Sequence, residues 1–195
     1  MTQYRKLTST VLPHDARVCE PDHAREGRLE MHAPAVDAMT DLRRVRAVTV
    51  GPQASVEAAQ QRMVAAQVRL LLVVDSQDAV LGLVTARDLL GEKPTRIAVE
   101  DGIAHGAVSI ERVMVRHDRV QVLDFADVQH SSVGDIVATL HDSGRQHALV
   151  LERGATPRVR GIFSITRIGR RLGVQLDANE RPQSFAEIEH LLASG

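Results

Sequence analysis

The stretch from residue 70 to residue 88, LLLVVDSQDAVLGLVTARD, decides the fold of this chain. Two short apolar runs, Leu70–Val74 and Val80–Thr85, flank the polar residues Asp75-Ser76-Gln77-Asp78. Apolar runs of this length predict buried strands rather than helices, and the polar segment between them predicts a turn. A helix is expected to begin at Ala86, so the stretch predicts a β-hairpin that is followed directly by a helix.

The same pattern returns in the second half of the chain. Residues 148–151 and 159–164 form a second pair of apolar runs, and a second helix is expected over residues 165–172. Val73 and Val150 occupy matching positions in the two patterns and lie 77 residues apart. A repeat at such a spacing predicts two copies of one structural unit.

A helix is expected before each hairpin, and each of these helices begins at a serine. Ser55 and Ser132 can each accept a hydrogen bond from a free amide of the first helical turn. Gly144 suits a left-handed stop at the end of the second of these helices. Apolar residues recur at helical spacing after each serine, namely Val56, Ala59 and Met63 in the first copy and Val133, Ile136, Val137 and Leu140 in the second. We refer to these residues as the apolar helix faces.

Each copy is therefore predicted to be a small α+β unit, built from a β-hairpin and helices. A unit of about 60 residues buries too little surface to be stable by itself, so the two pseudo-symmetric units are expected to pack against each other. Such packing leaves a cleft between the units, which is a natural place for a ligand.

Composition and charge argue against several classes of protein. The 195 residues include 24 Lys and Arg against 25 Asp and Glu, and aromatic residues make up 2% of the chain. A nearly neutral chain with few aromatic side chains gives no reason to expect nucleic acid binding. The sequence contains no run of 18 apolar residues, which is the length that would predict a membrane span. The amino-terminal stretch lacks the apolar region of a secretory signal. We expect a cytoplasmic protein without membrane insertion.

The motifs of common enzymes and metal sites are absent from the sequence. The nine histidines include no pair spaced for a metal on a helix, and His14, His23 and His32 lie too far apart to form a preset site. There is no Walker-type phosphate loop and no Gly-x-Ser-x-Gly elbow. The single Cys19 cannot form an internal disulfide and has no evident catalytic base. We therefore expect no enzyme, no catalytic cofactor and no metal site.

Several short stretches resemble the CBS domain (cystathionine-β-synthase domain). In the first copy they are residues 36–40, 48–50, 55–56, 72–75 and 82–88. The second copy resembles another CBS domain, so the chain resembles a tandem pair, or Bateman module. The expected division of the chain is an arm at 1–32, a first unit at 33–91, a linker at 92–109, a second unit at 110–173 and a tail at 174–195. A capping box from Ser184 to Glu187 predicts a short helix in that tail.

The resemblance implies an adenosyl ligand, namely AMP, ADP, ATP or S-adenosylmethionine. In the family a Thr/Ser-x-x-Asp sequence contacts the ribose and phosphate, and Thr85-Ala86-Arg87-Asp88 fits this sequence. A carboxylate can accept hydrogen bonds from both ribose hydroxyls, while a hydroxyl and free amides at a helix start can meet phosphate oxygens. The alternative is that Thr85 only caps the following helix, with Asp88 in its first turn.

The second copy departs from this sequence, because Ser164-Ile165-Thr166-Arg167 places Arg167 where the carboxylate should stand. An arginine carries donors only and cannot accept hydrogen bonds from ribose hydroxyls. The second cleft is then either empty or attracts a phosphate or another anion. The alternative for Arg167 is an exposed arginine on a helix. We expect one adenosyl ligand per chain, bound by Thr85 and Asp88.

The resemblance also implies further ligand-site residues around the base and the phosphates. They are Thr40, Val48, Val68, Arg69, Leu70 and His147. His147 belongs to the second copy, at a position from which the family contacts phosphates, and either protonation state of its ring can donate to a phosphate oxygen. The alternative is a surface histidine ahead of a strand.

Three functions remain open from the sequence. The first is a non-enzymatic sensor, for instance of cellular energy state, that binds an adenosyl ligand and modulates an unknown partner protein. The second is a ligand-free module for dimerisation and protein interaction. The third is a metal or nucleic acid binder on the same fold, which the neutral charge disfavours. The resemblance also implies a homodimer, and we expect the apolar helix faces to form its contact.

Overall fold

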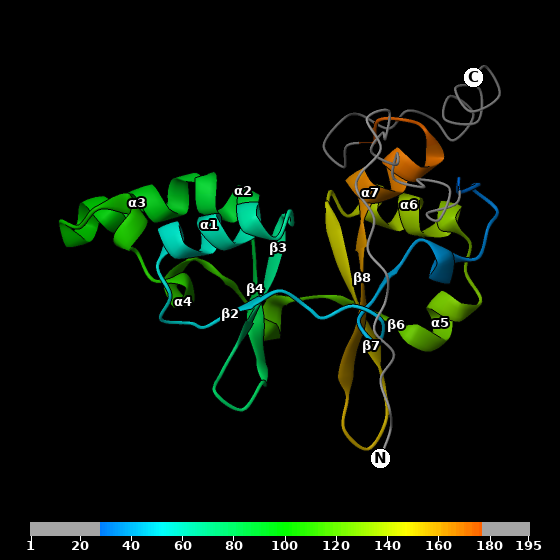
Figure 1. Ribbon diagram of the computed structural model, residues 1–195, viewed down its shortest axis with the longest axis horizontal. Helices are drawn as coiled ribbons and strands as arrows, with labels where there is room; N and C mark the ends of the chain where they lie inside the picture. The colour runs from blue at the N-terminus through cyan, green and yellow to red at the C-terminus, as the bar shows by residue number, and fades with distance from the viewer. Residues whose placement is uncertain (1–27, 177–195) are drawn as a thin grey trace, which may run out of the picture.

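The computed structural model describes residues 28–176. Two αβ units lie side by side, each with a four-stranded sheet and its own helices (Figure 1). The α+β fold of two pseudo-symmetric units is thereby confirmed. Most of the expected amino-terminal arm and the expected helix after Ser184 lie outside the described residues. Among the helices that are described, none is long and apolar enough to cross a membrane.

The first unit contains a sheet with the strand order β2-β3-β4-β5. Strands β2 and β3 are parallel, and the other neighbouring pairs are antiparallel. Its elements are β2 (Thr49–Val50), α1 (Val56–Ala65), β3 (Leu70–Val74), β4 (Val80–Thr85), α2 (Ala86–Leu90), α3 (Glu92–Asp101), η3 (His105–Ala107), α4 (Ile110–Val113) and β5 (Val115–Arg116).

The second unit repeats this arrangement with the strand order β1-β8-β7-β6. Here β6 and β7 are the parallel pair. Its elements are η2 (Ala35–Asp37), β1 (Thr40–Asp41), β6 (Val122–Asp124), α5 (Phe125–Gln129), α6 (Val133–Asp142), β7 (His147–Glu152), β8 (Arg158–Ser164) and α7 (Ile165–Leu172), and η4 (His117–Arg119) connects the two units.

The helix starts predicted from serine are present in both units. Ser55 Oγ accepts a hydrogen bond from Ala58 N at 3.1 Å. Ser132 Oγ accepts from Asp135 N at 3.2 Å while Asp135 Oδ2 accepts from Ser132 N at 2.8 Å, which completes a capping box. Gly144 has a φ of 62°, the left-handed conformation expected after α6. Both predicted hairpins, β3–β4 and β7–β8, are confirmed as well.

The apolar helix faces lie inside the units rather than on the surface. Val56, Ala59 and Met63 pack in the core of the first unit, and the corresponding residues of α6 pack in the core of the second. Each unit needs these side chains to cover its own sheet, because a sheet of four short strands buries little surface alone. The expected homodimer contact through the apolar helix faces is therefore wrong.

The two units exchange their edge strands. We call residues 35–41 the first strap and residues 110–116 the second strap. The first strap lies at the start of the expected first unit, but its strand β1 pairs with β8 and its apolar residues pack in the core of the second unit. The second strap does the reverse, since its strand β5 pairs with β4, and its residues Ile110, Val113 and Met114 pack in the core of the first unit. The repeat in the sequence did not predict this exchange.

Two glycines at matching positions admit the straps. Gly82 in β4 lies opposite Arg116, and Gly161 in β8 lies opposite Asp41. A Cβ atom on Gly82 would collide with the backbone carbonyl of the second strap, and one on Gly161 would collide with the Met39 side chain of the first. Close approach of another chain segment is a known reason for glycine inside a strand.

The units also meet directly through their hairpins. Leu70 and Leu72 of β3 and Leu149 of β7 form a buried apolar cluster that joins the two sheets. The expected packing of one unit on the other is thus present. The segment 92–109, expected to be a linker, folds as α3 and η3, and Ile97 and Ala98 of α3 are buried in the first core.

Candidate ligand-binding cleft

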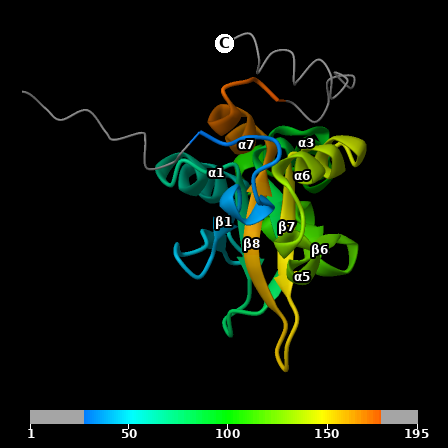
Figure 2. The same ribbon diagram turned by 90° about the vertical axis from the view of Figure 1, so that its right-hand side faces the viewer.

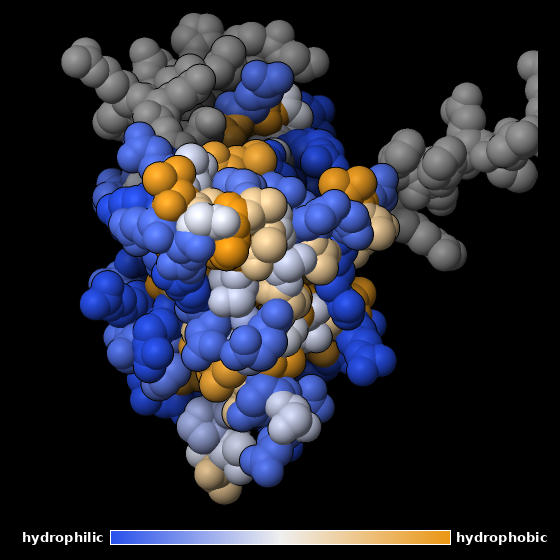
Figure 3. All heavy atoms as spheres, turned by 90° about the vertical axis from the view of Figure 1, so that its left-hand side faces the viewer, coloured by the Kyte–Doolittle hydropathy of each residue, from blue (hydrophilic) through white to orange (hydrophobic). Residues whose placement is uncertain are grey.

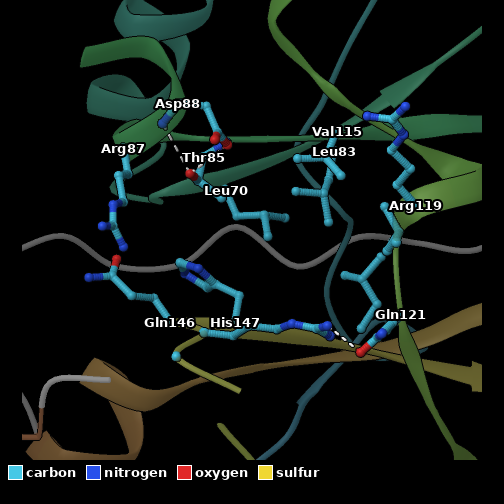
Figure 4. A pocket seen from close by; sticks show the side chains of 14 residues that line it. Leu70, Leu83, Thr85, Arg87, Asp88, Val115, Arg119, Gln121, Gln146 and His147 are labelled. Carbon is cyan, nitrogen blue, oxygen red and sulfur yellow. Dashed lines mark hydrogen bonds between the residues drawn. The ribbon is translucent and has the colours of Figure 1, made fainter. Parts of the chain in front are cut away.

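A cavity of about 260 Å³ opens where the two units meet (Figure 4). The first unit contributes the end of β4 and the start of α2, and the second unit contributes the turn before β7. Its apolar lining residues are Leu70, Leu83, Val115, Val120 and Leu149. Val115 belongs to the second strap, so the exchange of edge strands helps to build the cavity. A concave site with apolar walls and a few polar groups is typical of small-molecule binding.

Thr85 and Asp88 lie at the first-unit side of the cavity, where β4 passes into α2. Asp88 Oδ2 accepts hydrogen bonds from Thr85 N at 2.8 Å and from Thr85 Oγ1 at 2.7 Å, and Thr85 Oγ1 accepts from Asp88 N at 3.3 Å. The capping alternative from the sequence is therefore present as a full capping box. The box uses one carboxylate oxygen of Asp88, and both residues line the cavity. The second oxygen, Oδ1, accepts no hydrogen bond from residues 28–176 and can serve a ligand.

His147 faces these two residues from the second unit (Figure 4). Burial, together with the nearby positive charge of Arg69, lowers the pKa of His147 to about 4, against a smaller opposing effect of Asp88. The imidazole is therefore neutral at pH 7. Its Nδ1 atom is buried and has no hydrogen-bond partner among the described residues. A neutral ring with an unpaired nitrogen is suited to hydrogen bonding with a ligand rather than to charge pairing.

Three arginines that the sequence interpretation did not assign line the same cavity, namely Arg87, Arg119 and Arg145. Arg87 lies beside Gln146 at one side of the cavity, and Arg119 lies at the other side near Gln121 (Figure 4). Arg145 Nη2 donates to Gln121 Oε1, which fixes this guanidinium at the wall. Arg87 stands inside the Thr85–Asp88 sequence and could have been recognised. Arg119 could not, because only the strap exchange brings η4 to the cavity.

The residues implied by the resemblance fall into two groups in the structure. Leu70, Thr85, Asp88 and His147 line the cavity together. The other four residues do not line it. Val48 and Val68 pack against the core of the first unit, and Thr40 lies in β1 of the other sheet. Arg69 is exposed, and it is near enough to His147 to lower the pKa of that histidine.

Arg167 is not an exposed helix arginine, so that alternative is wrong. Its side chain is half-buried, and its Nη1 atom donates to Thr40 Oγ1 across the gap between α7 and the first strap. Ser164, at the start of α7, makes no capping hydrogen bond with its side chain. In the first unit, the residues at these positions are Asp88, Val115 and Thr85, which line the cavity. The guanidinium of Arg167 thus occupies the position of Asp88 and contacts the first strap.

No metal-binding group is found in the part of the chain that the structure describes. Within residues 28–176, no three His, Cys, Asp or Glu side chains are close enough together to hold a metal ion. His14, His23 and Cys19 lie outside these residues.

Comparisons with known proteins agree with this architecture. Residues 35–94 match the family model of the CBS domain. Among solved structures, an uncharacterized conserved protein from Pyrococcus horikoshii is similar at 21% identity and a TM-score of 0.55, with 80% of this chain and 99% of that chain covered. A CBS-domain containing protein from Agrobacterium tumefaciens is similar at 25% identity and a TM-score of 0.54, with 72% and 94% covered.

A third similar structure is that of CBSX2 in complex with AMP, at 19% identity and a TM-score of 0.50, with 71% of this chain and 94% of that chain covered. Curated protein sequences gave no match. The family match falls in the first half of the described chain, whereas the structural matches extend over both units and over nearly the whole length of the similar proteins.

Proposed function

Because the chain carries a tandem pair of CBS domains, we propose that it is a non-enzymatic regulatory module that binds one adenine nucleotide between its units and modulates a partner protein. The observation that supports this proposal most directly is the convergence of Thr85, Asp88 and three guanidinium groups on one cavity with apolar walls. The AMP complex of CBSX2, a protein of the same fold, adds to this support.

Each part of a nucleotide has a matching group in the cavity. The adenine ring packs between the leucine and valine side chains that form the walls, since a planar base gains most from apolar contact on both faces. Asp88 Oδ1 accepts hydrogen bonds from the ribose hydroxyls, while Oδ2 stays in the capping box. Thr85, at the start of α2, lies next to the first phosphate.

The charge of the cavity favours a phosphate ligand over S-adenosylmethionine. Three arginines and one carboxylate, Asp88, line it, and His147 is neutral at pH 7. The excess of positive charge attracts AMP, ADP or ATP, whose phosphates accept paired hydrogen bonds from guanidinium groups. S-adenosylmethionine carries a sulfonium cation, which the same charges repel.

A second function, ligand-free dimerisation, is favoured by an apolar groove at the far end of the first unit. Leu90 of α2 and Val99 of α3 line this groove and are 77% and 78% exposed. Figure 3 shows this end of the molecule, where apolar side chains lie among hydrophilic ones. The groove also carries Glu92, Arg96 and Glu100; Arg96 Nε lies 3.9 Å from Glu100 Oε1 within the chain, and Arg96 can also reach Glu92 of a second copy across a two-fold axis. We infer that a second copy of the chain docks here, whether or not a nucleotide is bound.

Isothermal titration calorimetry with AMP, ADP, ATP and S-adenosylmethionine separates these functions. We expect one nucleotide per chain, tighter binding of the phosphate ligands than of S-adenosylmethionine, and weaker binding as salt is raised. If none of the four ligands binds at millimolar concentration, the sensor proposal is refuted and the interaction module is retained. Tighter binding of S-adenosylmethionine than of the nucleotides would contradict the charge argument.

A further inference from the structure

One wall of the nucleotide cleft belongs to the second strap. Strand β5 of this strap pairs with β4 in the register Gly82↔Arg116 and Leu83↔Val115. Leu83 and Val115 both line the cleft, and Figure 4 shows them beside each other on one wall. Because β5 has two residues, its ladder with β4 contains few hydrogen bonds, so contacts outside the sheet are needed to fix the strap.

Helix α3 supplies two polar contacts to the second strap. Lys93 Nζ donates to the backbone carbonyl of Val113 at 3.1 Å, and the Asp101 carboxylate pairs with the guanidinium of Arg112. The contacts come from opposite ends of α3, since Lys93 lies in its first turn and Asp101 is its last residue. Buried residues of α3 pack in the same apolar core as those of the strap. Helix α3 therefore clamps the strap onto the first unit.

Both charges of this clamp are placed against the dipole of α3. The amino-terminal end of a helix carries a partial positive charge and the carboxyl-terminal end a partial negative charge. A lysine in the first turn and an aspartate as the last residue are therefore both slightly unfavourable for the helix itself. The contacts with the strap give a physical reason for these two residues that helix formation does not give.

The carbonyl that Lys93 contacts lies directly before the cleft wall. Val113 is the last residue of α4 and is 2% exposed. A carbonyl at the end of a helix has no partner within that helix, so the ammonium group satisfies a buried acceptor. The peptide plane of this carbonyl ends at Met114, and the next residue is Val115. A fixed orientation of this plane therefore fixes the direction in which the strap enters β5.

The first strap is held by a comparable contact on the second unit, where β1 lies beside β8 (Figure 2). Arg171 of α7 donates to the backbone carbonyl of Asp37. In both units, a cationic side chain from a helix after the hairpin thus contacts a backbone carbonyl of the strap. Of the two straps, only the second contributes a lining residue to the nucleotide cleft.

We propose that Lys93 and Asp101 are positioning residues of the nucleotide cleft, which they do not line: by clamping the second strap they fix Val115 in its wall. This inference rests on the proposed function, in which a nucleotide base packs against that wall. A displaced strap would leave the base without apolar contact on one side, so tight binding requires the docked strap. Apparent affinity then falls with the fraction of chains in which the strap is docked.

The first measurement needs no nucleotide. Hydrogen exchange followed by mass spectrometry should be faster over residues 110–116 in Lys93→Met than in the unmodified chain, and unchanged over residues 35–41. Lys93→Arg keeps a donor for the Val113 carbonyl and should restore slow exchange. Asp101→Asn removes one charge of a partly exposed ion pair and gives the same test if Lys93→Met does not fold. Equal exchange over residues 110–116 in the variants and the unmodified chain overturns the proposal.

Titration calorimetry with ATP then shows whether the clamp positions the cleft. Lys93→Met should lower ATP affinity roughly 3- to 10-fold, as loss of one hydrogen bond does, and Asp101→Asn should lower it less. Lys93→Arg should bind ATP as the unmodified chain does. The matched control is Arg43→Gln, which breaks the ion pair of Arg43 with Glu152 in the second unit and changes no residue of the cleft lining.

The outcomes separate this inference from the proposed function. Faster exchange of the strap with unchanged ATP affinity, or an equal loss of affinity in Arg43→Gln, overturns the positioning role of Lys93 and Asp101. Absence of ATP binding to the unmodified chain refutes the proposed function, and the clamp is then judged by hydrogen exchange.

Discussion

Replacement of Asp88 by alanine should remove two separate contributions of one carboxylate. The first is structural, because Asp88 Oδ2 closes the capping box of α2 by accepting from Thr85 N and Thr85 Oγ1. Thr85 Oγ1 can still accept from the backbone amide of residue 88 in this variant, so the loss should lie at the lower end of the about 0.5–2 kcal/mol of unfolding free energy that removal of a whole cap costs. The second is the acceptor for the ribose hydroxyls. Hydrogen bonds to a charged group contribute about 1.5–3 kcal/mol, so affinity for ADP or ATP should fall roughly 10- to 150-fold.

The second unit offers a matched control for this prediction. Asp135 makes the same capping box with Ser132, and its Oδ2 atom accepts from Ser132 N at 2.8 Å and from Ser132 Oγ at 2.7 Å. Asp135 does not line the cleft. Asp135→Ala should therefore lose a similar free energy of unfolding while keeping its affinity for nucleotide.

Urea unfolding and calorimetry on the two variants together give the answer. Both variants should show a similar loss of stability, and only Asp88→Ala should lose affinity. If Asp88→Ala binds ADP and ATP as tightly as the unmodified chain, with its fold intact by circular dichroism, Asp88 is only a cap. If Asp135→Ala weakens binding equally, the effect comes from general destabilisation and the assignment of the ribose site is refuted.

Three more predictions concern pH, assembly and the second copy. In the unfolded chain His147 takes up a proton at the ordinary histidine pKa of 6.5, whereas its pKa in the folded protein is lowered to about 4. The free energy of unfolding should therefore fall by up to about 3 kcal/mol as the pH is lowered from 6.5 to 4. Urea unfolding of His147→Asn should lack this contribution of His147 to the pH dependence. Sedimentation equilibrium should show a dimer of the 21.3 kDa chain, and an interface of standard size would bury on the order of 1,600 Å². The double variant Leu90→Glu, Val99→Glu should be monomeric. A monomeric unmodified chain contradicts this prediction. Arg167→Asp should raise the calorimetric stoichiometry from one nucleotide per chain to two, and an unchanged stoichiometry in a folded variant refutes it.

The elements with a periodic sequence pattern could be predicted, and those fixed by tertiary contacts could not. The hairpins and their flanking helices carry apolar runs and serine caps of ordinary length, so local physics specifies them. The strands β1 and β5 have two residues each, too few for any alternation to show. Helix α3 lies in the segment that was predicted to be a linker, in which Ile97-Ala98-Val99 is the only apolar run. Its Pro94 lies in the first turn, where proline is tolerated.

The candidate site was predictable only as far as it lies within one copy. Thr85, Asp88 and Leu70 are local to the first hairpin, and His147 follows from the same position in the second. Arg119 enters from η4 after the strap exchange, which no pattern within a single copy reveals. The sequence does hold one trace of the exchange, since Gly82 and Gly161 recur at matching positions within strands, where glycine signals close approach of another segment.

The charges on the two straps explain why each strap docks on the sheet of the other unit. The straps align at Met39 and Met114, 75 residues apart, and this alignment places Asp37 against Arg112 and Asp41 against Arg116. The first strap is therefore acidic where the second is basic. In the structure Asp41 pairs with Arg160 of the second unit, and Arg112 pairs with Asp101 of the first. Each strap thus meets the opposite charge on its own docking site.

The helices that receive the straps show the same reversal. Asp88 and Glu92 in the first unit correspond to Arg167 and Arg171 in the second, each 79 residues apart. An acidic strap docked beside Asp88 and Glu92 would bring like charges together, and so would a basic strap beside the two arginines, at a cost that disfavours the wrong pairing. Arg167 contacts the first strap through the Thr40 hydroxyl. The side chain that stands at the position of Asp88 in the second copy thus serves a contact with the first strap, whereas Asp88 itself lines the cavity of the first copy.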